Sequence, residues 1–327
     1  MSLRVSFFVA AAVLLLAVPL AMLAQQPQRI PRIGFLSLQS LKTDSRLPAF
    51  IAGMRERGYV EGQTITIEWR SADGDATRLA AYAEELVRLK VELIVAAQPQ
   101  AIEAARRVTG TIPIVFAVAQ DPVASGYAKS LARPGGSITG VSLVTPDIAP
   151  KQVELLKIVL PNLARVAVLV NRTNTGSPVQ VKAIQETANR VDVAVQVYYA
   201  STREEVEQAL AAAGREGAQA LILSGDSFFF QVRAVIAEAA MRHRLPTMFV
   251  QREHVVAGGM ISYGPSVSEN YRRSAYYVER ILKGAKASEL PIEQPTKIEL
   301  VINLKTAKAL GIAMSQSFLL RADELIQ

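Results

Sequence analysis

Polar residues that suit the binding of a small charged solute follow the predicted strands of this chain. Six of them stand at strand ends: Ser37, Gln98, Asp121, Asn171, Asp226 and Tyr263. In an open α/β sheet, ligands bind outside the carboxyl ends of the strands. Backbone N–H groups at helix starts and the hydroxyl of Ser37 suit a ligand carboxylate, whereas Asp121 and Asp226 suit an ammonium group. This combination predicts a binding cleft.

The two aspartates and a nearby aromatic run also have a purely structural interpretation. Asp121 and Asp226 could each cap the start of a helix. Phe228 to Phe230 are three consecutive aromatics whose side chains would point about 100° apart on a helix, so they cannot all enter one core. We expect one of them, Phe229, to face a ligand together with Tyr263. Simple packing of all three in cores and loops is the alternative.

Motifs of common enzymes and metal sites are absent from the sequence. It contains no phosphate-binding loop, no dinucleotide-binding glycine motif, no nucleophile elbow and no zinc-protease motif. The two histidines, His243 and His254, are eleven positions apart, and no cysteine could join them in a metal site. We therefore expect no cofactor, no metal and no enzymatic activity. An α/β enzyme is the less favoured alternative, because no nucleophile–base pair is recognisable.

Strands and helices alternate along the first part of the chain. The predicted strands are Arg32–Leu38, Thr64–Trp69, Val91–Ala97 and Ile112–Ala119, and the predicted helices are Leu47–Gly58, Ala76–Lys90, Ala101–Val108 and Pro122–Ala132. Apolar residues at helical spacing indicate the helices, and short apolar or alternating runs indicate the strands. The alternation predicts a parallel sheet with helices on both faces, which the chain leaves through a further strand, Ser137–Leu143.

The same alternation begins again after residue 150. The predicted strands are Arg165–Asn171, Val193–Tyr199, Ala218–Leu223 and Pro246–Val250, and the predicted helices are Lys151–Leu160, Pro178–Val191, Glu204–Ala213 and Val232–His243. Thr202 is placed to cap the third of these helices, with Glu205 three residues later. A second α/β body of similar size is therefore expected.

The segments after Gly258 are not needed to complete the second body. They are a strand, a helix over Asn270–Lys283, a proline-containing connector, a strand over Lys297–Leu304, a short helix and a polar end. We interpret them as returning across the boundary. The expected fold is thus α/β, with two doubly wound parallel-sheet lobes joined by a multi-crossover hinge. The expected lobes are residues 30–142 plus 266–292, and residues 143–265 plus 293–327.

The first 24 residues are typical of an export signal. Arg4 is followed by the apolar run Val5–Leu16 and a small-residue exit, so we expect cleavage near Ala24 and a periplasmic protein. Met22 is bulky for its place before the cut, which leaves an uncleaved anchor as the alternative. Because the chain has no cysteine, it cannot carry a lipid-modified N-terminal cysteine, so we expect no lipoprotein. Basic residues are scattered among acids without a nucleic-acid motif, so we expect no nucleic-acid partner.

Stretches spread over nearly the whole mature chain carry a family resemblance. They are Phe116–Val118 with Asp121–Val123, Arg133–Gly136, Thr139–Ser142, Lys151–Lys157, Arg165–Asn171, Arg242–Pro246, Arg252-Glu253, Gly258–Pro265, Tyr271–Arg273 and the tail Glu293–Gly311. The tail is the most specific of them. The chain resembles bacterial ABC-transporter substrate-binding proteins of the type I periplasmic-binding fold, the group that includes tryptophan- and tyrosine-binding members.

The resemblance implies a two-lobed receptor without enzymatic activity, which closes on a small solute and presents it to the membrane subunits of an ABC permease. We expect the ligand to be an amino acid or a related organic acid with an apolar or aromatic body, and the receptor to be a monomer. The sequence departs from similar proteins at Gln98-Pro99-Gln100, where small residues are common. A periplasmic sensor subunit that signals to a membrane kinase is the alternative. The export signal disfavours a cytoplasmic repressor of related fold.

Overall fold

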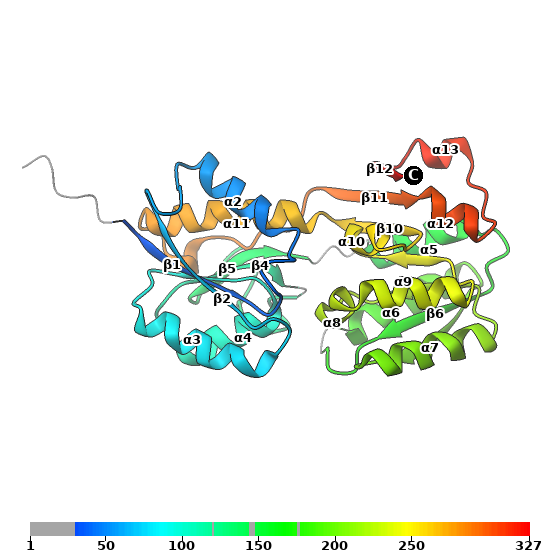
Figure 1. Cartoon of the computed structure of the whole chain (residues 1–327), viewed down its shortest axis with the longest axis horizontal. Coiled ribbons are helices and arrows are strands. Elements are labelled where there is room, and N and C mark those ends of the chain that lie inside the picture. The colour runs from blue at the N-terminus through cyan, green and yellow to red at the C-terminus, as the bar shows by residue number, and fades with distance from the viewer. Residues whose placement is uncertain (1–29, 120, 144–147, 175–176) are drawn as a thin grey trace, which may run out of the picture.

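Two α/β lobes make up the part of the chain that the structure describes (Figure 1). The computed structural model describes residues 30–119, 121–143, 148–174 and 177–327. Each lobe has a central, mainly parallel sheet with helices on both faces, which confirms the expected fold class. The predicted export signal lies outside the described residues and stays a prediction.

The first lobe is built on a five-stranded sheet in which every strand pair is parallel. Its strands lie in the order β2 (Thr66–Ser71), β1 (Arg32–Ser37), β3 (Ile94–Ala96), β4 (Ile114–Ala119) and β5 (Ile138–Ser142). Successive side chains of a strand point to opposite faces, so Phe35 and Leu36 enter different cores. Leu36 shares one core with α3 (Leu79–Arg88) and α4 (Pro99–Val108). The short 3₁₀ helix η1 (Ala76–Arg78) directly precedes α3. Phe35 shares the other with α2 (Leu47–Glu56) and α11 (Val267–Leu282).

The second lobe has a seven-stranded sheet. Its strands lie in the order β12 (Glu324–Ile326), β11 (Ile298–Asn303), β10 (Ile261–Pro265), β9 (Thr247–Phe249), β8 (Ala220–Leu223), β6 (Arg165–Val170) and β7 (Ala194–Tyr199). All neighbours are parallel except β10 and β11, which pair antiparallel because the chain re-enters the sheet after α11.

Helices cover both faces of this second sheet. Val168 shares a core with α5 (Ile148–Val159), α6 (Ser177–Arg190), α12 (Leu304–Ala309) and α13 (Gln316–Leu319). Leu169, the next residue of β6, points to the opposite face. It shares a core with α7 (Arg203–Arg215), α8 (Ser227–Gln231), α9 (Arg233–Arg242) and α10 (Arg252–Val256).

The chain passes between the lobes three times: after β5, between β10 and α11, and between η2 (Ala287–Glu289) and β11. Two of these crossings run side by side. Ser142 N donates to Glu293 O at 2.8 Å, and Glu293 N donates to Gly140 O at 3.1 Å. Helix α11 follows its crossing directly and packs against α2 and β4 of the first lobe. The packing of α11 against the first lobe is consistent with our proposed lobe boundaries at residues 142, 265 and 292.

Several features of the fold differ from the sequence prediction. No helix forms over Pro122–Ala132, so that prediction is wrong. Gly126 adopts φ = +70°, and the N–H groups of Tyr127 and Ala128 both donate to Pro122 O, which makes a series of turns instead. The helix expected from Val232 is preceded by α8. The tail, expected to be only polar, adds β12 to the edge of the second sheet.

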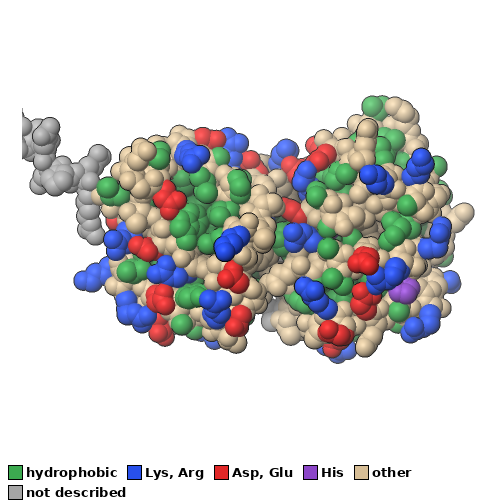
Figure 2. Space-filling model, viewed as in Figure 1, with side chains coloured by type: hydrophobic (Ala, Val, Ile, Leu, Met, Phe, Trp, Pro, Cys, Tyr) green, Lys and Arg blue, Asp and Glu red, His purple; other side chains and the backbone are tan. Residues whose placement is uncertain are grey.

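Figure 2 shows Lys and Arg side chains interspersed with Asp and Glu over both lobes of one face. No large single-sign patch is visible on that face, in keeping with the scattered charges of the sequence. Among the described residues there is no helix with the length and apolar content needed to cross a bilayer.

Candidate ligand-binding site

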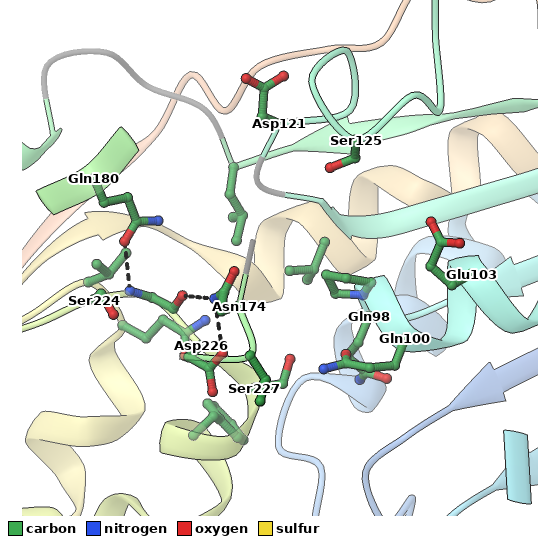
Figure 3. Close-up of a pocket in the computed structure, with 18 of the residues that line it drawn as sticks. Gln98, Gln100, Glu103, Asp121, Ser125, Asn174, Gln180, Ser224, Asp226 and Ser227 are labelled. Carbon is green, nitrogen blue, oxygen red and sulfur yellow. Dashed lines mark hydrogen bonds between the residues drawn. The ribbon is translucent and has the colours of Figure 1, made fainter. Parts of the chain in front are cut away.

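A cavity of about 750 Å³ is lined by residues of both lobes. This size lies in the usual range of small-molecule sites, about 300 to 1,000 Å³. The first lobe contributes strand ends, turns and helices α3 and α4, and the second contributes α5, α6, α8 and the segments after β8 and β9. Figure 3 shows side chains of the two lobes facing each other across this space. The cavity therefore lies where an open α/β sheet places its ligands.

Gln98 lines the first-lobe wall at the start of α4, and its amide is held on both sides. Its Oε1 accepts from Leu38 N at 2.9 Å and from Ser37 Oγ at 3.4 Å. Its Nε2 donates to Tyr271 Oη at 3.2 Å. Ser37 is fully buried and also donates to Gln39 O. Ser37 thus supports Gln98 from behind and does not line the cavity itself.

Asp121 lines the same wall immediately after β4. Its Oδ1 accepts from Val123 N at 3.1 Å and from Ala124 N at 2.9 Å, which fixes the turn that replaces the expected helix. Nearby, Tyr127 lines the cavity, and burial followed by the Glu103 carboxylate raises the pKa of its phenol to about 12. Tyr127 therefore stays neutral and available for hydrogen bonding near neutral pH.

Asp226 lines the second-lobe wall and is bonded to four N–H donors. Its Oδ1 caps α8 by accepting from Phe228 N at 2.8 Å and from Phe229 N at 3.3 Å. The same oxygen accepts from Asn171 Nδ2 at 3.0 Å. Asp226 Oδ2 accepts from Asn174 Nδ2 at 2.9 Å (Figure 3). A carboxylate has about four acceptor sites. Asp226 is therefore already well satisfied before any ligand arrives.

The other three candidates from the sequence lie behind the wall. Asn171 is 5% exposed and orients Asp226, while its own Oδ1 accepts from Thr173 and from Ser201 Oγ. Phe229 is fully buried in the core of the second lobe, and Phe230 lines the cavity in its place. The 100° step of a helix explains why neighbouring phenylalanines face different surroundings. Tyr263 packs against the opposite core of that lobe.

Several polar residues of the wall were not singled out from the sequence. Gln152 of α5 is 2% exposed, and its Nε2 donates at 3.0 Å to both Phe249 O and Tyr263 O, which leaves its Oε1 as an acceptor. Ser224 Oγ and Gln251 Oε1 are buried and have no hydrogen-bond partner among the described residues. Both residues line the cavity, so a bound solute would satisfy them. Because they follow β8 and β9, the strand-end rule could have found them.

Arg46 borders the cavity where the two lobes meet. Its side chain is 2% exposed and pairs with Asp44, with Nε–Oδ1 at 2.6 Å and Nη2–Oδ2 at 2.9 Å, and it also donates to Gln39. The guanidinium carbon lies 4.3 Å from the ring centre of Phe230 and 5.0 Å from that of Tyr271. Burial raises the pKa of Tyr271 well above its usual value, so this phenol remains neutral.

The rest of the wall is largely apolar. Its apolar members include Leu79, Val108, Val118, Leu143, Ile148, Val179, Ile184, Leu223, Phe230 and Val250. No group of side chains suited to hold a metal ion occurs within the described ranges. A cavity that combines apolar side chains with amides, hydroxyls and charged groups can bind the apolar body of a small solute and hydrogen-bond its polar end.

Comparisons with known proteins agree with this geometry. The family model described as ABC transporter substrate binding protein matches residues 35–326. A tyrosine-binding protein of Clostridioides difficile (strain R20291) is 26% identical over 270 residues, which cover 82% of this chain and 77% of the relative.

Two solved structures extend the comparison. An ABC domain in complex with L-Trp from Streptococcus pneumonia has a TM-score of 0.84 and 25% identity, and the match covers 90% of this chain and 99% of that one. The ligand-free, open structure of a substrate binding protein with adhesive properties from Clostridium difficile has a TM-score of 0.70 and 24% identity, covering 91% and 100%. The family expected from the motifs is thus confirmed: the chain belongs to the ABC transporter substrate-binding proteins, whose relatives include binders of aromatic amino acids.

Proposed function

We propose that this protein is the periplasmic receptor of an ABC importer and that its ligand is an amino acid with an apolar or aromatic body. The observation that carries the proposal is the 750 Å³ cavity between the lobes, with its largely apolar wall and a few held polar groups. The ligands in the names of the two relatives, tyrosine and L-Trp, support the same class of solute.

We assign different parts of the ligand to different residues of the cavity wall. Asp121 has one carboxylate oxygen engaged with backbone N–H groups, and we assign the other to the ligand ammonium. Ser224 and Gln251 supply unpartnered groups on the opposite wall, and Gln98 supplies a held amide. Phe230 and the aliphatic side chains would pack against the ligand body. In this assignment Asp226 mainly shapes the wall, supported by Asn171.

The family and the predicted export signal support the proposed transport role. The receptor, released near Ala24, would bind its solute outside the cytoplasm, close, and present it to the membrane subunits of the permease. It would act as a monomer and without catalysis. Cell fractionation tests the location: we expect the mature protein in the periplasmic fraction, and full-length protein retained in the inner membrane after a salt wash would contradict a cleaved signal.

A ligand screen tests the function. We expect L-tyrosine, L-tryptophan or a related solute to raise the thermal unfolding temperature, because a ligand that binds only the folded state stabilises it. Calorimetry then gives the affinity. Ser224→Ala should weaken binding of the same solute by about three- to tenfold, as expected for one neutral hydrogen bond. A matched control is Ser317→Ala, on α13 and outside the cavity wall. Stabilisation by sugars but by no amino or organic acid would contradict the proposed ligand class.

A further inference from the structure

Two contacts between the lobes lie beside helix α8, at one border of the cavity. Arg46 belongs to the first lobe and Phe230 to the second, and they meet with the guanidinium carbon 4.3 Å from the ring centre. Next to them, Gly74 of the first lobe approaches α8 so closely that an added Cβ would lie 3.3 Å from Gln231 Oε1. Figure 1 shows α8 at the side of the second lobe that faces the first. We call these four residues the cross-lobe contact.

Arg46 is held rigidly on its own side of the contact. Two parallel bonds join it to Asp44, and Asp44 Oδ2 also accepts from Tyr271 Oη at 3.2 Å. Tyr271 lies on α11, the helix that follows a crossing between the lobes, and its hydroxyl accepts from Gln98 of the cavity wall. The guanidinium is therefore part of a buried network that contains a wall residue and the helix beside the hinge.

Phe230 has a second cation over its ring, which supplies an internal comparison. The Arg233 guanidinium carbon lies 4.6 Å from the ring centre, and its Nη1 donates to Phe230 O at 2.8 Å. Arg233 and Phe230 belong to the same lobe, so their contact persists when the lobes separate. The contact of Arg46 with Phe230 cannot persist, because it spans the cleft. The two arginines thus differ in whether their contact depends on closure.

We propose that Arg46 is a positioning residue for the ligand site: its guanidinium binds the ring of Phe230 when the lobes close and so selects the closed form around the solute. The proposal deepens the proposed function, since closure traps the ligand. The greater similarity of this structure to a ligand-bound relative than to an open one supports placing the contact in the closed form. A cation over an aromatic face, shielded from water, favours the state that contains it.

The test measures the equilibrium between open and closed forms directly. The chain has no cysteine, so Glu84→Cys on α3 and Lys182→Cys on α6, both well exposed and on different lobes, give a unique pair for fluorescent labels. We expect Arg46→Lys, which keeps the charge beside Asp44 but loses the planar group, to lower the closing equilibrium constant by about three- to thirtyfold. The matched control Arg233→Lys should change it by less than about twofold.

A double-mutant cycle separates the contact from general effects of each change. Phe230→Leu alone should also disfavour closure, and it serves as the second variant if Arg46→Lys folds poorly. Because both changes remove the same interaction, combining them should add little. The closing equilibrium constant of the double variant should lie within about twofold of that of the single variant that closes less readily. With L-tyrosine or L-tryptophan as probe, Arg46→Lys should raise the dissociation rate constant by the same factor.

Equal effects of Arg46→Lys and Arg233→Lys would overturn the proposal, and so would additive effects of Arg46→Lys and Phe230→Leu. The label distance is measured both without ligand and with each probe. If no amino acid or related organic acid binds, the proposed function fails, whereas the comparison of the two arginine variants in the ligand-free protein still decides the role of Arg46.

Discussion

Gln98 and Tyr271 are joined by a hydrogen bond of 3.2 Å although they lie 173 positions apart in the chain. Gln98 is part of the cavity wall, and Tyr271 lies in the first turns of α11, directly after the chain has crossed from the second lobe. Tyr271 also donates to Asp44, which holds Arg46. The wall that would meet the solute and the helix beside the hinge therefore belong to one buried polar network.

Loss of the Tyr271 hydroxyl should destabilise the protein. Tyr271→Phe leaves the buried Asp44 and Gln98 each without one partner, so we expect the free energy of unfolding to fall by about 1 to 3 kcal/mol. Urea unfolding measures the change. Tyr276→Phe, on the same helix but only partly buried, should change the free energy by less than about 0.5 kcal/mol. If both variants lowered the free energy of unfolding equally, the hydrogen-bond network around Tyr271 would not contribute more to stability than an ordinary tyrosine hydroxyl does.

Removal of the Asp121 charge should weaken ligand binding. A charge-assisted hydrogen bond in a closed cavity contributes about 1.5 to 3 kcal/mol, so Asp121→Asn should raise the dissociation constant by roughly ten- to hundredfold. Calorimetry with the solute found in the screen measures this. The control is Asp75→Asn, because Asp75 also caps a turn of the first lobe, through Thr77 N at 3.0 Å, but does not line the cavity. Wild-type affinity of Asp121→Asn would remove the carboxylate from the proposed ligand contacts.

Asp226 should matter for folding through its cap. Asp226→Ala removes the acceptor of four N–H groups, two of them at the start of α8, and we expect a loss of about 1 to 2 kcal/mol in the free energy of unfolding. Chemical denaturation measures it. Thr202→Ala, which removes one capping bond at α7 in the same lobe, sets the scale for a simple cap at about 1 kcal/mol. A smaller loss for Asp226→Ala than for Thr202→Ala would contradict the structural role of the network.

Stability should fall in mild acid because of one buried histidine. Burial, assisted by the Arg233 guanidinium, lowers the pKa of His254 from 6.5 to about 3. Between these values the unfolded chain binds a proton that the folded chain does not. The free energy of unfolding should therefore fall as the pH falls, by up to about 1.4 kcal/mol per pH unit.

This dependence can be assigned to His254 with two variants. Urea unfolding between about pH 7.5 and about pH 5.5 avoids most carboxylate titration. His254→Phe, an aromatic replacement beside Phe249 and Phe230, should flatten the dependence, whereas His243→Gln should retain it. An unchanged pH dependence in His254→Phe would contradict the assignment.

Much of the fold follows from local patterns in the sequence. The apolar run before Asp121 forms β4, and Thr202 caps α7 by accepting from Glu205 N, because these signals depend on neighbouring residues alone. The failures have two different causes, one local and one nonlocal. Pro122 is a good first residue of a helix, but Gly126 takes a left-handed conformation and turns the chain back. Strand β12 is only three residues long and exists because β11 offers it an edge.

The site was predictable to a lesser extent. The strand-end rule locates Gln98, Asp121 and Asp226 on the wall, because parallel strands bring their carboxyl ends together. The rule cannot distinguish residues that line the cavity from residues that support them. Ser37 and Asn171 occupy strand ends too, yet they hydrogen-bond the wall residues from behind. Gln152 lies on a helix, and the pairing of Arg46 with Phe230 spans the two lobes, so no spacing in the sequence reveals either.

Small-angle scattering of the protein with and without its solute tests the central claim most directly, namely that two lobes close on a small ligand. At about 100 times its dissociation constant the ligand should add roughly 2.7 kcal/mol to the free energy of unfolding, which establishes saturation. The radius of gyration should then be smaller than that of the ligand-free protein. An unchanged radius of gyration with a saturating, stabilising ligand would contradict closure.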